Sequence, residues 1–311
     1  MTLKTVVVGQ HWGADGETAF VARSLAGAAA RVGEVAVIAP GWPAQPTADG
    51  LFDVRGIPAG SDLSQTAGLS ADSVVIVDEL GPDMVTALPS GLVRAAFYLT
   101  SLRASVAPPW RQLSLVPDPD LPDFSPLGPY VPVNPLAAQH RHHGFGFTGY
   151  VLILSDPEEG ADPPAAANWI GAALPEADVV VVGDGTASAW KECSLRGRVG
   201  IDTRTDLWRL MAHAMVCIDL APGPLIGREC VEALRYGTPV IVPGDSGPAA
   251  VHARASSGHT FADAAELVAA TLEMREPERR SNASVSGKAY ADEYFGDPDR
   301  YVARLAALFS E

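Results

Sequence analysis

Short apolar runs alternate with helical patterns along most of the chain. Lys4–Gly9, Glu34–Pro40, Val74–Val77 and Ala95–Thr100 are rich in β-branched and small apolar residues, which predicts buried parallel strands. Between the first two, residues 16–32 place small and apolar side chains at helical spacing and predict a helix. This alternation predicts an α/β sheet whose strands are joined by right-handed crossovers.

The pattern stops at a proline-rich segment and then starts again. Prolines recur through residues 104–135, which predicts loop and short extended pieces, and residues 136–149, rich in His and Gly, predict a connector. Strands are then expected at Tyr150–Leu154, Ala177–Val182, Val216–Leu220 and 238–242, and helices at Pro164–Ala173, Asp206–Ala214, 227–236, Ala262–Leu272 and Asp299–Phe309.

Two Rossmann-like α/β domains facing each other across a cleft explain this restart. We expect the first domain to span residues 1–140, with 299–311 returning to it, and the second to span 150–298. Doubly wound sheets bind ligands at the carboxyl ends of their strands, so the cleft between the domains is the expected site.

Composition and charge narrow the class of protein. The 311 residues have a globular composition and a formal net charge of −15, which argues against a nucleic-acid partner but allows a nucleotide held by a few local groups. Cys193, Cys217 and Cys230 are odd in number and lack CxxC spacing, which favours a reducing compartment. Without a signal-peptide pattern or a membrane-spanning apolar run, we expect a cytoplasmic protein.

One stretch, GPLIGRECVEALRYGTPVIVPGDSG (residues 223–247), combines helix and ligand signals. A helix that begins near Gly227 offers backbone N–H groups and the positive end of its dipole to a phosphate. Glu232, one turn further, can accept hydrogen bonds from ribose hydroxyls. The alternative is a surface ion pair between Arg228 and Glu232 at i and i+4, worth about 0.3 kcal/mol.

The same stretch resembles the signature of the retaining GT-B glycosyltransferases, with its EAL helix followed by G-x-P-V-I. PEADVVVVGDG (175–185) and LRGRVGIDTRTDLWRLMAHAMVCIDLA (195–221) resemble the family segments that precede it. The resemblance implies a GT-B fold with an N-terminal acceptor domain and a C-terminal donor domain. It also implies metal-independent transfer, with retention, from a nucleotide sugar to an acceptor of unknown kind (sugar, lipid-linked sugar or small molecule), without a cofactor.

The resemblance also implies roles for particular residues. Glu232 would hold the donor ribose, and the backbone N–H groups from Ile226 to Glu229 would bind the diphosphate. The glycines implied in donor binding are Gly183 and Gly185 at the base, and Gly13 and Gly16 at the phosphates from the other domain.

The sequence departs from the family at charged positions. Pro224 stands where the family has its first Glu, and LSDPEEG (154–160) carries Asp156 and Glu159 where the family has a basic pair on the diphosphate. The candidates to replace that charge are Arg196, Arg198, Arg204 and Arg228. These departures favour a second interpretation, a catalytically degenerate GT-B protein that acts as a binding or regulatory partner of an active transferase.

His11 and Trp12 directly follow the first strand, at the edge of the sheet where loops carry function. The acceptor-side histidine of the family is absent from FYLTSLRA (97–104), so His11 is the candidate general base. A polar ring and an indole at this place can contact an acceptor sugar. The alternative is a packed loop.

Two further motifs contain residues that can ligate metals. Asp118–Pro–Asp120 lies in the proline-rich loop with no strand before it, and His140 to His143 lie in the expected connector. Neither context holds ligands rigidly, so we expect no metal site.

Overall fold

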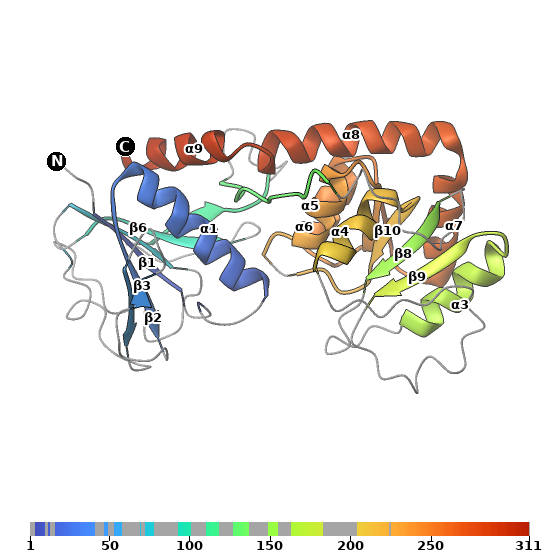
Figure 1. Ribbon diagram of the computed structural model, residues 1–311, viewed down its shortest axis with the longest axis horizontal. Helices are drawn as coiled ribbons and strands as arrows, with labels where there is room; N and C mark the ends of the chain where they lie inside the picture. The colour runs from blue at the N-terminus through green and yellow to red at the C-terminus, as the bar shows by residue number, and fades with distance from the viewer. Residues whose placement is uncertain are drawn as a thin grey trace. The chain divides into compact units, whose positions relative to one another are not determined.

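A computed structural model gives the fold of the chain (Figure 1). It describes residues 4–9, 12, 16–40, 47–48, 53–57, 69, 72–77, 93–100, 110–117, 127–136, 149–154, 163–182, 204–223 and 225–310. The chain divides into two compact units: unit 1 holds Met1–Tyr130 and Asp297–Glu311, and unit 2 holds Val131–Gly296. Each unit has its own, mainly parallel sheet, which confirms the predicted α/β class.

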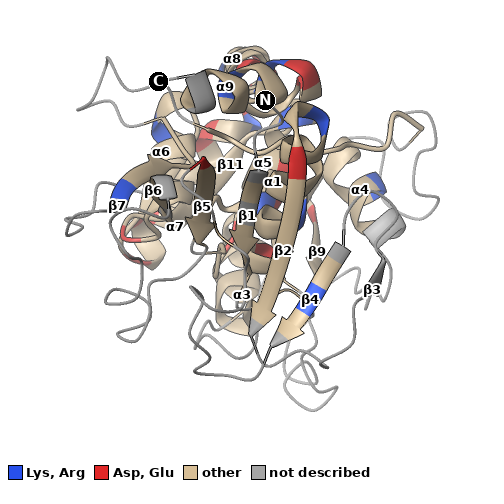
Figure 2. Ribbon diagram, turned by 90° about the vertical axis from the view of Figure 1, so that its left-hand side faces the viewer, with Lys and Arg blue, Asp and Glu red and all other residues tan. Residues whose placement is uncertain are grey.

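The sheet of unit 1 has the strand order of a doubly wound dinucleotide-binding fold. Its strands are β1 (Lys4–Val8), β2 (Glu34–Pro40), β3 (Thr47–Ala48), β4 (Asp53–Ile57), β5 (Ser73–Val77), β6 (Val93–Thr100) and β7 (Trp110–Ser114). The order is β3-β4-β2-β1-β5-β6-β7, and only β3 pairs antiparallel. The order therefore reverses between β1 and β5. In Figure 2 the visible strands of this sheet are mostly tan, with blue bands on β4 and β7.

Helices α1 (Glu17–Val32) and α9 (Pro298–Ser310) pack against each other in unit 1, although they lie at opposite ends of the chain. Small residues on α1, including Ala22, Ala26 and Ala29, are wholly buried. The exposed ion pair from Arg31 Nη2 to Asp299 Oδ1, at 2.7 Å, adds little stability because both charges are in water.

Unit 2 is built on a five-stranded parallel sheet. Its strands are β8 (Tyr150–Leu154), β9 (Asp178–Val182), β10 (Val216–Asp219), β11 (Val240–Pro243) and β12 (His259–Phe261), in the order β12-β11-β10-β8-β9. Its helices are α3 (Pro163–Ala173), α4 (Arg204–His213), α5 (Arg228–Arg235), α6 (Pro248–Ala255), α7 (Ala264–Arg275) and α8 (Pro277–Phe295).

Both faces of the unit 2 sheet are buried, which explains its continuous apolar runs. Along β8, Leu152 belongs to a core with α4, α5 and α6, whereas its neighbour Ile153 belongs to a second core with α3 and α7. Adjacent strand residues point to opposite faces, so an uninterrupted apolar strand supplies both cores.

Three elements of unit 2 and three strands of unit 1 were not predicted: α6, β12, α8, β3, β4 and β7. Strand β7 lies inside the segment expected to hold loop and short extended pieces, and it is a short extended piece that pairs with β6. Helix α8 has a polar sequence, and its buried positions are Ala283, Gly287, Ala291 and Phe295, one per turn. A Cβ at Gly287 would lie 2.7 Å from Leu234 Cδ2, so α5 and α8 pack closely through small residues that carry little hydrophobic signal. No described helix is both long and apolar enough to cross a bilayer.

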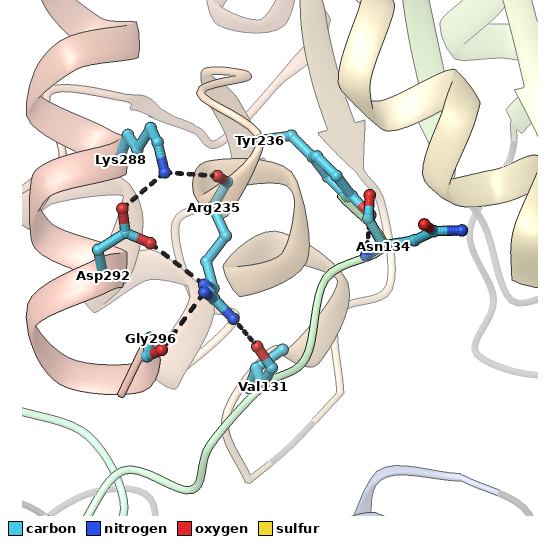
Figure 3. A network of polar contacts seen from close by, with 7 residues as sticks. All are labelled: Val131, Asn134, Arg235, Tyr236, Lys288, Asp292 and Gly296. Carbon is cyan, nitrogen blue, oxygen red and sulfur yellow. Dashed lines mark hydrogen bonds and ion pairs between the residues drawn. The ribbon is translucent and has the colours of Figure 1, made fainter. Parts of the chain in front are cut away.

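Arg235, the last residue of α5, holds the two chain segments at which unit 2 ends (Figure 3). Its guanidinium donates to the carbonyls of Val131 and Gly296, and its Nε lies 3.2 Å from Asp292 Oδ1. Lys288 Nζ donates to the other Asp292 oxygen at 2.6 Å and to the Arg235 carbonyl at 3.2 Å. We call these residues the Arg235 clamp.

Arg235→Met should destabilise unit 2 by about 2 kcal/mol, because it removes the guanidinium donor of two carbonyls and one of the two cations that contact the half-buried Asp292 carboxylate. The measurement is urea unfolding. Arg279→Met is the control, since Arg279 makes an exposed 2.8 Å pair with Glu273 and its loss should cost less than about 0.5 kcal/mol. Equal stability of the two variants would contradict the clamp.

Candidate functional site

Helix α5 begins at the point where the strand order of the unit 2 sheet reverses. The chain passes from β8 to β9 on one side and then returns to place β10 on the other side of β8. The carboxyl ends of β8 and β10, at Leu154 and Asp219, therefore flank the switch point at which such sheets bind ligands. Residues 220–227 lead from β10 into α5 at this edge, which makes the start of α5 the candidate site.

The turn before α5 requires glycine. Gly227 has φ 58° and ψ 58°, in the left-handed region, and a Cβ there would lie 3.0 Å from Ala249 Cβ. The first hydrogen bond of the helix runs from Val231 N to Gly227 O at 3.1 Å. The amide groups of residues 228–230 consequently point out of the helix end. The prediction that the helix begins near Gly227 is confirmed.

The carboxylate of Glu232 is wholly buried inside unit 2. Its Oε1 lies 2.7 Å from Arg228 Nε, and its Oε2 accepts a 3.1 Å hydrogen bond from Trp208 Nε1 on α4. The Arg228 side chain is 12 % exposed. The ion pair proposed from the i, i+4 spacing therefore exists, but it is not the solvated surface pair of that interpretation. Removing one partner of such a pair is costly because the other remains buried and charged.

Asp219 connects the end of β10 to the first turn of α5. Its Oδ1 accepts from Ala221 N at 3.3 Å, and its Oδ2 accepts from Cys230 Sγ at 3.5 Å. Burial, together with the nearby Asp219 charge, raises the pKa of the Cys217 and Cys230 thiols well above the ordinary value. Both thiols therefore stay protonated and act as packing groups, not as nucleophiles.

His252 on α6 approaches the same turn from the interior. Its Nε2 lies 2.6 Å from Ile226 O, and its Nδ1 lies 2.7 Å from Tyr290 Oη on α8. The imidazole is fully buried and packs edge-on against the Phe295 ring at 5.3 Å between centroids. Burial lowers the pKa of His252 from 6.5 to about 4, and the hydrogen bond to Ile226 O opposes this shift.

Some of the remaining predicted site residues lie within the residue ranges that the structure describes, and the others lie outside them. Ile226 is buried, and Glu229 is half-buried in the first turn of α5. Gly16 is the exposed N-cap of α1, with φ 123°. Residues outside the described ranges are His11, Gly13, Asp118, Asp120, His140 to His143, Asp156, Glu159, Gly183, Gly185, Arg196, Arg198 and Pro224; the side chain of Arg204 also lies outside them.

Trp12 is a core residue of unit 1. Its indole is 6 % exposed, and its Cε3 would lie 3.1 Å from a Cβ placed on Gly9. Its carbonyl accepts from Arg23 Nη1 at 3.1 Å. The packed-loop interpretation therefore holds for Trp12, whereas the role suggested for His11 stays a prediction.

The sequence reasoning missed Trp208, His252 and Tyr290. Trp208 lies in the predicted helix Asp206–Ala214 but was given no role there, although a tryptophan in a polar helix indicates a buried contact. His252 follows the apolar run PAAV, where a histidine needs partners, and this was the available signal. Tyr290 had none, because α8 itself was not predicted.

A cavity of about 390 Å³ in unit 2 lies at the opposite edge of the sheet from the start of α5. Gly149, Met215 and Pro239, which line it, directly precede β8, β10 and β11. Parallel sheets bind their principal ligands at the carboxyl edge, so this cavity is not the predicted site. Across the residues with described positions, no three His, Cys, Asp or Glu side chains gather as metal ligands.

Solved glycosyltransferases share the fold of the whole chain. WaaG, a glycosyltransferase involved in lipopolysaccharide biosynthesis, matches with TM-score 0.63 and 15% identity over 96% of this chain and 98% of its own. Sucrose-phosphate synthase from Thermosynechococcus elongatus matches with TM-score 0.64 and 13% identity over 99% and 98%. HepE from Anabaena, solved with UDP and glucose, matches with TM-score 0.61 and 15% identity over 99% of both chains.

These likenesses define the class of fold. No protein-family model and no curated protein sequence matches the chain. The structural matches cover almost the full length, and the two parallel α/β sheets are those of GT-B glycosyltransferases. The predicted GT-B fold is confirmed.

Gly227→Ala should destabilise the protein by about 2 kcal/mol, because alanine is strained at this φ and its methyl group would press on Ala249. Urea unfolding measures the loss. Gly244→Ala is the control, since its Cβ would make an ordinary 3.6 Å contact with Phe261 O. A loss for Gly227→Ala no larger than for the control would mean that the turn is not constrained as described.

The stability of the wild-type protein should fall below pH 6.5 because of His252. Its folded pKa is lowered, so the unfolded state binds the proton first, and the contribution is complete above pH 6.5 and lost towards pH 4. Between pH 7.5 and 5.0 this amounts to about 2 kcal/mol. Urea unfolding of wild type and His252→Gln at both pH values measures it, and the stability difference between them should shrink at pH 5.0. A difference independent of pH would contradict the assignment.

Proposed function

We propose that the protein is a glycosyltransferase that moves a sugar from a nucleotide-sugar donor to an acceptor, with retention of configuration. The observation that carries this proposal is the glycine-initiated N-terminus of α5, which lies at the switch point of a parallel sheet in a GT-B chain. Retention rests on the resemblance of residues 223–247 to the retaining families. HepE, a structural neighbour, was solved with UDP and glucose, which supports a nucleotide sugar as donor.

In this proposal the donor diphosphate binds at residues 226–229. The helix start supplies backbone N–H groups and a dipole equivalent to roughly half a positive charge. Arg228 adds a guanidinium in the same turn, but Glu232 neutralises it at 2.7 Å. An ion-paired arginine attracts a diphosphate less than an isolated one, so we expect binding weaker than in enzymes that have a basic pair.

The ribose is proposed to bind near Glu232. Both carboxylate oxygens already have donors, Arg228 and Trp208. A ribose contact therefore requires one of these hydrogen bonds to be exchanged when the nucleotide arrives. The Trp208 bond is the longer of the two, at 3.1 Å, and joins a neutral donor, so it is the one expected to yield.

The second candidate is a GT-B protein that has lost catalysis and serves a partner transferase. The full enclosure of Glu232 favours it, because a carboxylate locked in an ion pair can be kept for stability alone. The two candidates differ in turnover, not in fold. In both, we propose a cytoplasmic protein of carbohydrate metabolism, without metal or cofactor, whose acceptor is a sugar, lipid-linked sugar or small molecule.

A thermal-shift panel of UDP-, GDP-, ADP- and TDP-sugars tests the proposal. One donor should raise the melting temperature, since a ligand at 100 times its Kd stabilises by about 2.7 kcal/mol. Calorimetry should then show that Glu232→Gln binds the nucleotide on the order of tenfold more weakly while remaining folded. Glu278→Gln, at an exposed position of α8, is the matched control and should bind as wild type does.

Donor hydrolysis or transfer separates the two candidates. Product formation with the donor anomeric configuration, followed by NMR, supports a retaining enzyme, and binding without turnover supports the degenerate partner. If no nucleotide binds at millimolar concentration, both are rejected.

A further inference from the structure

The turn that starts α5 is held from inside unit 2 by two residues on other helices. His252 of α6 contacts the Ile226 carbonyl at 2.6 Å, and Tyr290 of α8 contacts the other ring nitrogen at 2.7 Å. These three residues come from separate parts of the chain, and we call them the Tyr290–His252–Ile226 relay. Neither the fold nor the proposed donor chemistry assigns a role to it.

The chemistry of the atoms fixes the direction of the relay. A carbonyl oxygen only accepts, so His252 Nε2 carries the proton and donates to Ile226 O. The buried ring is neutral, so Nδ1 is an acceptor and the Tyr290 hydroxyl donates to it. Tyr290 therefore selects the tautomer in which the ring can hold the Ile226 carbonyl.

The relay fixes one peptide unit at both of its polar ends. The Ile226 carbonyl is held by His252, and the N–H of the same peptide, from Gly227, donates to Gly223 O at 3.2 Å. Ala249, one turn before His252 on α6, packs against Gly227 on the side that a Cβ would occupy. The orientation of this peptide and the left-handed Gly227 backbone together set where the amides of residues 228–230 point.

The origin of the hydrogen bond to the Ile226 carbonyl matters for ligand binding. A buried carbonyl in front of a helix requires a hydrogen-bond donor. Here the hydrogen-bond donor is His252 Nε2 on α6, so the Ile226 carbonyl does not accept from an N–H group at the start of α5. A carbonyl that accepted from the N–H groups at the start of α5 would compete with an incoming anion for them.

We propose that His252 is a positioning residue for the diphosphate of the donor, with Tyr290 as the residue that holds its ring. This inference rests on the proposed nucleotide-sugar function. His252 does not touch the ligand. It orients the peptide that leads into α5, so that the amide groups of the first turn converge on the phosphates.

The test compares a nucleoside with its diphosphate, because only the diphosphate would use the turn. Calorimetry at pH 7.5 with uridine and UDP, or with the matching pair for the base that the wild-type protein binds, gives the ratio of the two Kd values. His252→Phe keeps a ring but no donor, and it should lower the preference for the diphosphate on the order of tenfold. Nucleoside affinity should change little.

Three further variants distinguish the proposed effect from a general loss of structure. Tyr290→Phe keeps the packing and removes the hydroxyl, so it should shift the ratio in the same direction by a smaller factor. His252→Gln retains an N–H donor and should partly restore the ratio. Thr271→Val removes a buried 2.8 Å hydrogen bond to Leu267 O on α7, far along the chain from the turn, and should leave the ratio unchanged.

The outcomes separate this inference from the function on which it rests. If wild type binds neither nucleoside nor diphosphate, the proposed function fails and the inference fails with it. If wild type prefers the diphosphate but His252→Phe and Tyr290→Phe weaken both ligands equally, the function stands and His252 is only a structural residue. A selective loss of the diphosphate preference in both variants supports the proposal.

Discussion

The enclosure of helix α5 is the constraint on which unit 2 depends. The helix has only eight residues, yet it lies against α4, α6, α8 and the sheet, and five consecutive residues from Cys230 to Leu234 are buried. A carboxylate in the middle of such a helix must be neutralised, because an unpaired buried charge costs several kcal/mol. Arg228 neutralises Glu232, and Trp208 adds a hydrogen bond to its second oxygen. The packing of the helix and the pairing of its charge therefore cannot be separated.

The two ends of α5 make different kinds of contact. At the N-terminus the amides point outward, and the turn is held from behind by Ala249 and His252. At the C-terminus the Arg235 guanidinium reaches the carbonyls of Val131 and Gly296, which are the last residues of unit 2 on either side. One short rigid element thus connects the candidate ligand turn to the places where the chain leaves the unit.

Apolar patterning predicted the elements that bury long side chains. The strands at Lys4, Glu34, Tyr150 and Val216 were found in this way, because a doubly buried parallel strand is an unbroken apolar run. The helices α1, α3 and α4 were found from apolar residues at helical spacing. Helix α8 escaped because it packs through Ala283, Gly287 and Ala291, and small residues give a weak signal however completely they are buried. Strand β7 escaped because its neighbours are prolines. The position of the turn before α5 was predictable from Gly227 and the resemblance. The contact between His252 and Ile226 that holds this turn was not, because it joins residues 26 positions apart and hydrophobic periodicity carries no information about such pairs.

The buried ion pair also bears on how the proposed diphosphate site would hold an anion in so acidic a protein. A free arginine at the first turn would attract a diphosphate strongly, but Arg228 is engaged and its charge is largely cancelled at short range. The remaining attraction comes from the backbone N–H groups, whose dipoles are fixed in direction before the ligand arrives. Preorganised dipoles lose little energy in reorientation, and in a partly dry site they act more strongly than in water. The precision with which His252 and Gly227 set the turn would therefore matter more here than in a site rich in free cations, because each amide has to compensate for charge that the sequence does not provide.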